Sequence, residues 1–185
     1  MARTTLTKQL AQPPGPQAFT LPHNWVPRSY QRALFAAYER GIKRFVLNWH
    51  RRSGKDDACL HLCTVAMADR PGLYLYVFPT IKLARDAIWN AVVQRGKFMD
   101  AFPAAWLEGD PNNSEMLIRV KALPGQPTGS IWKLTGADDP DSLRGLNPVG
   151  VVLSEFSQHQ SNVWDQIISP TVSYTHLTLP TNREV

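Results

Sequence analysis

The 185-residue sequence has only two cysteines, no long apolar run and almost no acidic residues over its first 55 positions. Two cysteines cannot form a disulfide framework, which favours a reducing compartment. No apolar stretch approaches the roughly 20 residues that a membrane-spanning helix needs, and the first 20 residues lack the apolar block of a secretory signal. These absences predict a soluble intracellular domain with no membrane partner.

Basic residues are concentrated at the front of the chain. Residues 1–55 carry ten Lys or Arg and one acidic residue, Glu39, which gives +9. Residues 56–185 carry ten basic and fourteen acidic residues, which gives −4. A basic region suits a polyanion such as DNA or a nucleotide phosphate. A solvated basic helix surface would account for the same charge, so charge alone leaves both interpretations open.

Hydrophobic patterning predicts strands that alternate with helices. Short apolar runs bounded by turn residues are typical of buried strands, and they occur at 45–49, 73–78, 116–120, 130–134 and 149–153. Helical spacing occurs at 30–40, 56–68 and 81–94. This alternation predicts an α/β fold with a mainly parallel sheet and helices on both faces. The runs at 116–120 and 130–134 are expected to pair as a hairpin.

The segment 48–56 lies between a predicted strand and a predicted helix, where a phosphate-binding loop belongs. Backbone N–H groups at a helix start favour an anion, Gly54 lets the backbone approach a phosphate, and Lys55 reaches it as a point charge. Two residues depart from the usual pattern: Trp49 replaces the first glycine, and Asp56 replaces the hydroxyl residue that holds Mg²⁺. A basic turn capped by Asp56 is the alternative.

Three cations within five residues favour the phosphate-loop interpretation. Arg51, Arg52 and Lys55 repel one another, and a bound anion would relieve that repulsion. The second signal is Glu155, which follows the apolar run 149–153. A nucleotide hydrolase needs a carboxylate there to orient or deprotonate water, although a surface glutamate after a core strand is the alternative. Ser154 stands where an aspartate would normally help to hold Mg²⁺.

Taken together, these segments resemble the ATPase domain of the large terminase subunit of tailed bacteriophages, the motor that packages viral DNA. The similarity covers roughly residues 20–171. The segments that carry it are 27–31, 51–56, 76–80, 84–89, 143–145, 151–155 and 164–170. Each is moderately specific, and their order and spacing make the match. The resemblance implies a P-loop NTPase of the additional-catalytic-glutamate type, with 51–56 as Walker A and 151–155 as Walker B.

The resemblance also implies roles for individual residues. Tyr30 would stack on adenine and Gln31 would read its edge. Glu155 would be the catalytic carboxylate, Arg51 would sense the γ-phosphate, and Arg144 would reach a neighbouring subunit's nucleotide. The implied cofactors are ATP and Mg²⁺. The predicted nucleotide contacts are Tyr30, Gln31, Arg51, Arg52, Ser53, Gly54, Lys55 and Asp56, and the predicted metal ligands are Asp56 and Ser154.

The implied function is ATP hydrolysis that moves double-stranded DNA into a viral procapsid. Its expected partners are DNA, other large subunits in a ring, the portal protein and the small terminase subunit. The expected place is the host cytoplasm and, transiently, the procapsid portal. Two alternatives stay open: another P-loop nucleic-acid translocase or helicase-like ATPase, and a basic nucleic-acid-binding module without catalysis.

Three regions are expected along the chain. Residues 1–27 are proline-rich and predict an arm or linker, and 28–171 form an incomplete ATPase domain. Residues 172–185 do not continue the terminase pattern and resemble a translated sequencing adapter, so we expect them not to be native. The coupling motif and the nuclease domain of terminases would then be missing, and the sheet would have an exposed apolar edge.

Overall fold

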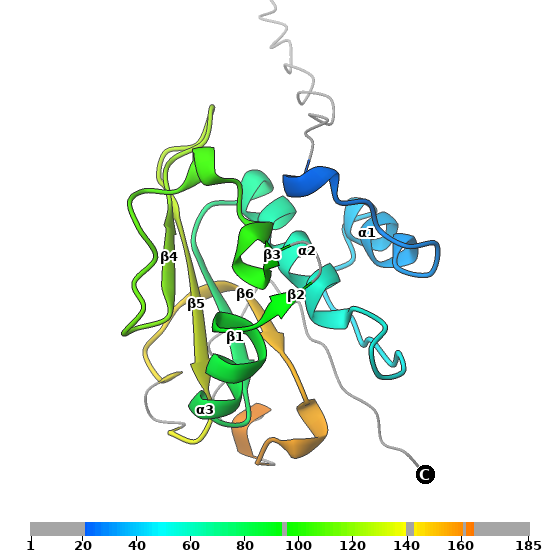
Figure 1. Cartoon of the computed structure of the whole chain (residues 1–185). Helices are drawn as coiled ribbons and strands as arrows, with labels where there is room; N and C mark the ends of the chain where they lie inside the picture. The colour runs from blue at the N-terminus through cyan, green and yellow to red at the C-terminus, as the bar shows by residue number, and fades with distance from the viewer. Residues whose placement is uncertain (1–20, 94–95, 140–142, 161, 165–185) are drawn as a thin grey trace, which may run out of the picture.

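The computed structural model describes residues 21–93, 96–139, 143–160 and 162–164. Its centre is a four-stranded sheet in the order β4-β5-β1-β6 (Figure 1). The strands are β1 (Leu73–Phe78), β4 (Leu117–Val120), β5 (Ser130–Gly136) and β6 (Pro148–Leu153). Strand β1 is parallel to both β5 and β6, and β4 is antiparallel to β5. The predicted hairpin and the predicted parallel strands are thereby confirmed.

The described residues form the α-helices α1 (Arg32–Glu39), α2 (Lys55–Asp69) and α3 (Ile81–Ala84) beside the sheet. A π-helical turn, η2 (Arg85–Trp89), continues α3. The smaller elements are the 3-10 turns η1 (Pro22–Asn24), η3 (Phe98–Ala101), η4 (Ala104–Trp106) and η6 (Phe156–Gln158), and a pair of short strands, β2 (Val92–Val93) and β3 (Gly96–Lys97). No helix in the described part of the chain is long and apolar enough to cross a membrane.

Two predicted elements were wrong in extent or type. The helix expected over 81–94 ends at Trp89, because the β-branched Val92 and Val93 take the extended conformation they favour and pair with β3. The strand expected over 45–49 is absent among the described strands. Its burial alternates, with Phe45 and Leu47 buried and Val46 71% exposed. The apolar run therefore lies against the core along one side only.

Strand β1 is buried on both faces, as a central parallel strand should be. On one face, Tyr74, Tyr76 and Phe78 pack against α2 in the larger part of the core. On the other face, Leu75 and Val77 pack with residues of β6 and of the segments that follow β5 and β6. Those residues are Leu143, Val151, Leu153 and Val163.

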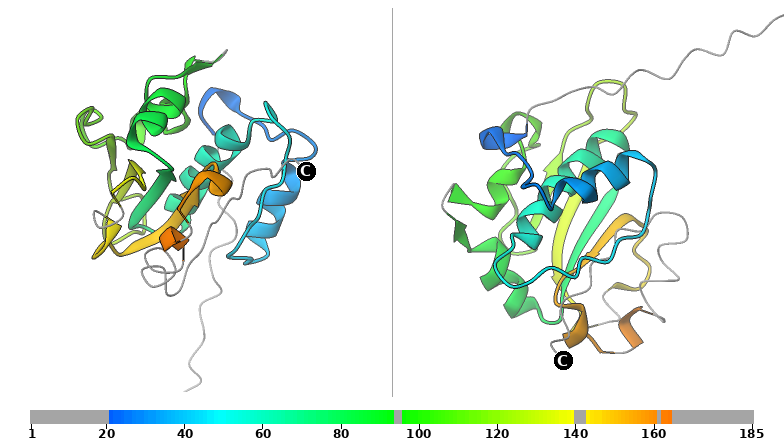
Figure 2. Two further views of the ribbon diagram at one scale, coloured as in Figure 1. Left: turned by 90° about the horizontal axis from the view of Figure 1, so that it is seen from below. Right: turned by 90° about the vertical axis from the view of Figure 1, so that its right-hand side faces the viewer.

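Helix α2 is buried nearly all round because it lies between α1 and the sheet (Figures 1 and 2). Ten consecutive residues of α2 include nine that are buried, among them Leu60, Leu62 and Met67. Each such apolar side chain contributes about 1.5–3 kcal/mol on full burial. The two cysteines of the chain, Cys59 and Cys63, are free thiols buried in this helix. This rigid helix sets the position of the loop that precedes it.

Candidate functional site

The loop before α2 folds sharply and ends in a glycine that the turn requires. Gly54 has φ +74° and is the residue that precedes the helix, and its carbonyl accepts the N–H of Ala58 at 3.0 Å. Arg52 also has a positive φ, of 59°. The first turn of α2 therefore directs its backbone N–H groups toward the loop, which is the arrangement that binds anions. The predicted loop-to-helix boundary is confirmed.

Lys55 folds back across this loop. Its Nζ donates a 2.6 Å hydrogen bond to the carbonyl of Trp49. An ammonium group has three donors, so this bond leaves two for another acceptor. The indole of Trp49 in turn meets the ring of Tyr30 edge-on, with the ring centroids 5.6 Å apart. Lys55 thus links the beginning and the end of the loop at the helix N-terminus.

Gln31 braces the same loop from the start of α1. Its Nε2 donates to the carbonyls of Ser53 (3.1 Å) and Gly54 (3.2 Å), and its Oε1 accepts the N–H of Arg28 at 2.9 Å. The residue is only 1% exposed. Tyr30 adds a 2.7 Å bond from its hydroxyl to the Ser53 carbonyl. In this conformation the amide N–H groups of Gln31 bond to two carbonyls of the loop. A hydrogen bond from Gln31 to the edge of an adenine stays a prediction.

Asp56 and Ser154, 98 residues apart in sequence, are joined by a direct hydrogen bond. Ser154 Oγ donates to Asp56 Oδ1 at 2.9 Å, and the hydroxyl of Tyr76 donates to the same oxygen at 2.6 Å. Burial, and next the nearby Asp56 carboxylate, raise the pKa of Tyr76 well above its ordinary value. The Tyr76 hydroxyl therefore stays protonated and remains a donor. Helix α2 and strand β6 meet at this contact.

Glu155 follows at the end of β6 in a left-handed conformation, with φ 53°. The β6 pairing extends to the residue before it, because Ser154 N–H donates to the Val77 carbonyl at 2.9 Å. The Glu155 carboxylate is partly exposed and lies 3.4 Å from Gln158 Nε2. Non-glycine residues in this region are strained and cluster at functional sites. Lys55 directly precedes Asp56 in the sequence, and Glu155 directly follows Ser154. The Asp56–Ser154 hydrogen bond therefore brings the backbones of Lys55 and Glu155 near each other.

The three predicted arginines are exposed. Arg51 and Arg52 lie in the loop itself, and Arg144 lies on the segment between β5 and β6, beside Gly145. Exposure leaves the guanidinium groups accessible to a nucleotide or to another molecule. Their proposed roles at the γ-phosphate and in a neighbouring subunit stay predictions.

Sequence reasoning missed two side chains at this site. Tyr76 was assigned only to a strand, although its place in that strand puts its hydroxyl level with the start of α2. His159 Nε2 donates to the Ser154 carbonyl at 2.9 Å, and burial lowers the pKa of its imidazole. An alternation of inward-facing tyrosines in 73–78 could have identified the first, whereas no local pattern distinguishes the second.

The oxygens of Asp56 and Ser154 suit a divalent cation of the hard type. Both hydrogen bonds to the carboxylate reach Oδ1, and Oδ2 takes part in neither. Mg²⁺ is usually held by one or two protein oxygens together with phosphate and water. Within the described residues no group of three or more His, Cys, Asp or Glu gathers. Asp56 and Ser154 thus offer one carboxylate and one hydroxyl oxygen to such an ion.

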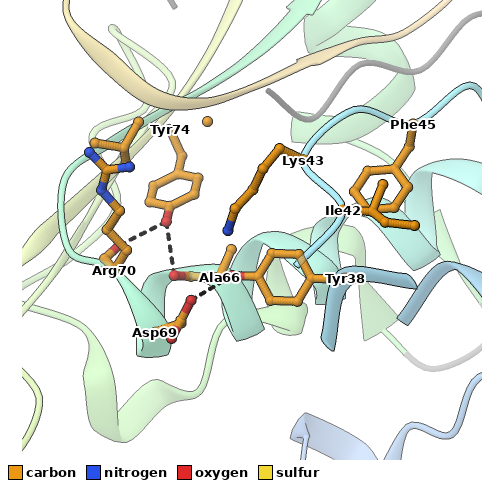
Figure 3. A pocket seen from close by; sticks show the side chains of 10 residues that line it. Tyr38, Ile42, Lys43, Phe45, Ala66, Asp69, Arg70 and Tyr74 are labelled. Carbon is orange, nitrogen blue, oxygen red and sulfur yellow. Dashed lines mark hydrogen bonds between the residues drawn. The ribbon is translucent and has the colours of Figure 1, made fainter. Parts of the chain in front are cut away.

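A small hollow lies at the C-terminal end of α2, away from the loop (Figure 3). It is bordered by Tyr38, Lys43, Asp69 and Tyr74. Tyr74 donates to the carbonyls of Ala66 (2.8 Å) and Arg70 (2.7 Å). The volume of this cavity is about 40 Å³, which is room for a few water molecules and not for a nucleotide. The candidate site is therefore the loop end of α2.

The chain resembles known proteins both in sequence and in fold. No protein-family model matches the chain. The terminase large subunit of Thermus virus P23-45 is 26% identical over 145 residues, which covers 75% of this chain and 30% of that protein. The terminase large subunit of Thermus phage G20c matches with the same identity and coverage. The chain therefore spans about 30% of the length of the curated relatives that it matches.

Solved structures match the fold. The large terminase ATPase domain of Thermus phage P74-26 aligns with a TM-score of 0.63 at 23% identity, over 87% of this chain and 67% of that one. The large terminase of a second thermophilic bacteriophage, in complex with ADP, aligns with a TM-score of 0.64 at 12% identity, over 83% of this chain and 38% of that one. These likenesses, together with the mainly parallel sheet, confirm the predicted α/β fold.

Proposed function

We propose that this chain is a phage terminase ATPase domain, like the proteins that it resembles in sequence and fold, and that it binds ATP with Mg²⁺ at the loop end of α2 and hydrolyses it to move DNA. The observation that carries the proposal is the 2.9 Å bond between Asp56 and Ser154. This bond joins the first turn of α2, which follows the phosphate loop, to the residue that lies between β6 and Glu155.

The phosphates would bind at the N-terminus of α2. There the helix offers backbone N–H groups and the positive end of its dipole. Lys55 lies at this position with two of its three N–H donors outside its bond to Trp49, and it would take the β- and γ-phosphates. Arg51, exposed on the same loop, would stabilise charge on the γ-phosphate. The remaining loop contacts proposed are Arg52, Ser53 and Gly54.

Glu155 would orient and deprotonate the attacking water. Its carboxylate is partly exposed at the end of β6, directly after the residue that bonds to Asp56. A general base must lie within hydrogen-bond reach of the water it activates. Mg²⁺, held by Asp56 and Ser154, would neutralise charge on the phosphates. Arg144 would supply a further positive charge to the nucleotide of a neighbouring subunit in a ring.

The proposed work of this ATPase is translocation of double-stranded DNA into a procapsid. The curated relatives are named as terminase large subunits. The proposed partners are DNA, further large subunits, the portal protein and the small subunit, in the host cytoplasm. The basic surplus of residues 1–55 supports a polyanionic partner.

Nucleotide binding tests the proposal directly. Isothermal titration with ATPγS in Mg²⁺ should show binding to the wild-type chain and none to Lys55→Ala. Lys43→Ala, which removes an exposed lysine beside the hollow at the other end of α2, is the matched control and should bind as the wild type does. Absence of nucleotide binding by the wild-type chain would favour the basic nucleic-acid-binding module.

A further inference from the structure

We propose that the two protein ligands of the nucleotide-bound Mg²⁺ have exchanged places in this chain, and that Tyr76 positions the exchanged carboxylate. The carboxylate ligand is Asp56, on helix α2, and the hydroxyl ligand is Ser154, at the end of β6. The inference rests on the proposed ATP binding and on its two metal ligands, and it adds the exchange of their positions and the side chain that orients the carboxylate.

The exchange is visible in the sequence positions. In the usual phosphate loop, the residue after Gly-Lys is Ser or Thr and contacts Mg²⁺ through its hydroxyl, while an aspartate at a strand end holds the metal from the other side. Here Asp56 follows Gly54-Lys55, and Ser154 precedes Glu155. One carboxylate and one hydroxyl are therefore both present, but here the carboxylate is on the helix and the hydroxyl is at the strand end. The charge of the pair is unchanged.

The distance between the two oxygens fits one metal ion. Mg²⁺ binds six oxygens at about 2.0–2.1 Å in near-ideal octahedral geometry, which sets neighbouring ligand oxygens about 2.9 Å apart. Ser154 Oγ and Asp56 Oδ1 are 2.9 Å apart. The two oxygens thus have the separation of adjacent ligands, although they lie 98 residues apart in sequence, and the Ser154 hydroxyl proton would turn away from Asp56 Oδ1 when both oxygens coordinate the ion.

Tyr76 explains how a carboxylate on the helix is held in place. Its hydroxyl donates to Asp56 Oδ1 at 2.6 Å, and the residue is fully buried. Strand β1 pairs directly with β6, with Tyr76 opposite Val152. The tyrosine therefore fixes the Asp56 rotamer relative to the strand that carries Ser154. Partners that orient a metal-binding carboxylate commonly change metal affinity by about 10–100-fold when they are removed.

The neighbouring acid shows that Asp56 is not needed merely as a negative charge at the helix start. Asp57 lies in the same first turn, but it accepts a 2.8 Å bond from Trp25 Nε1 and lies 3.5 Å from the imidazole of His61. Asp57 thus supplies a favourable charge for the helix dipole from another side. Asp56 is directed at β6.

A reciprocal exchange tests the ligand assignment. ADP affinity is measured by titration calorimetry in Mg²⁺ and in EDTA, and Mn²⁺·ADP binding by electron paramagnetic resonance, for Asp56→Ser, Ser154→Asp and the double variant. Asp56→Ser, which removes the carboxylate, should lose at least about tenfold of the Mg²⁺-dependent affinity, as expected when a metal site is disturbed. The double variant should recover to within about threefold of the wild type (ΔΔG about 0.6 kcal/mol).

The outcomes separate this inference from the proposed function. If the wild type binds ADP and the double variant is no better than the worse single variant, the ligand assignment is overturned while ATP binding stands. If the wild type binds no ADP in either solution, the proposed function itself fails. Should Asp56→Ser not fold, Asp56→Asn keeps the shape and acceptor oxygen, and it should retain affinity in EDTA while losing the Mg²⁺ enhancement. An unchanged enhancement in Asp56→Asn contradicts the assignment.

A matched pair of tyrosines tests the positioning role. Tyr74 and Tyr76 face α2 from the same strand, and both hydroxyls are hydrogen-bonded. Tyr76→Phe should weaken ADP binding in Mg²⁺ by about tenfold and leave binding in EDTA unchanged. Tyr74→Phe should leave both values unchanged. Equal effects of the two variants would assign Tyr76 to packing alone and overturn its role.

Discussion

The two ends of helix α2 receive the same kind of side chain from strand β1 and use it differently. At the C-terminal end, the Tyr74 hydroxyl satisfies the backbone carbonyls of Ala66 and Arg70. At the N-terminal end, the Tyr76 hydroxyl bonds to a side-chain carboxylate instead. The last carbonyls of a helix need partners, whereas the N-cap residue Gly54 at the other end makes no side-chain cap hydrogen bond. The tyrosine at the C-terminal end thus completes the helix itself, and the tyrosine at the N-terminal end holds a side chain of the proposed nucleotide site.

The largest expected effect lies at the C-terminal end of α2. A Cβ at Gly150 would come within 2.7 Å of the Tyr74 ring, which two hydrogen bonds hold in place. Gly150→Ala should therefore cost about 1–3 kcal/mol of the free energy of unfolding, as overpacking of a core does. Urea unfolding followed by circular dichroism measures the cost. An unchanged midpoint would mean that Tyr74 is not fixed as described.

The matching glycine at the N-terminal end should respond less. Gly54 has φ +74°, and a Cβ there would lie 3.2 Å from Gln31 Nε2. Gly54→Ala should cost about 1–2 kcal/mol from the left-handed backbone, and it should also weaken ATPγS binding because the loop shifts. Gly150→Ala should leave nucleotide affinity intact in the folded fraction. Reversal of this pattern would contradict the division between the two ends.

Removal of the brace on the loop should have a moderate effect. Gln31→Leu keeps the size of a side chain that is 1% exposed but leaves the carbonyls of Ser53 and Gly54 without its amide. Because the Ser53 carbonyl keeps the Tyr30 hydroxyl and the Gly54 carbonyl keeps the Ala58 N–H, we expect a loss of only about 0.5–1.5 kcal/mol in unfolding free energy and weaker ATPγS binding. If stability is unchanged and only affinity falls, Gln31 contacts the nucleotide directly, as the terminase resemblance implies.

The smallest effect should be a pH dependence at the end of β6. Burial lowers the pKa of His159 below its ordinary value of 6.5. The unfolded chain therefore binds the proton more readily, so this residue reduces stability as the pH falls through 6.5 toward the folded-state pKa. The melting temperature should fall more between pH 7.5 and 5 for the wild type than for His159→Gln. Parallel curves would show that burial of His159 does not persist in solution.

Much of this arrangement could be predicted from local patterns, and the rest could not. The helix over 55–69 and strands at 73–78 and 148–153 follow from apolar spacing and turn residues. Segment 45–49 was wrongly assigned as a buried strand, because an apolar run does not reveal that Val46 faces solvent. A carboxylate at the end of the 149–153 strand was expected beside the phosphate loop from the needs of a nucleotide hydrolase and from the terminase resemblance, and the Asp56–Ser154 bond agrees with that expectation. The contact of Asp56 with Tyr76 depends on the register between helix and sheet, which no single segment contains.

The left-handed backbone of Glu155 has a consequence for how this position tolerates change. A non-glycine residue in that conformation is less favourable than glycine by about 1–2 kcal/mol, so Glu155→Gly would relax the turn after β6. The same change would remove the carboxylate proposed to activate water. Variants selected only for thermal resistance would therefore tend to lose glutamate here. At position 155, glycine would therefore favour stability of the fold, and glutamate would favour the proposed ATP hydrolysis.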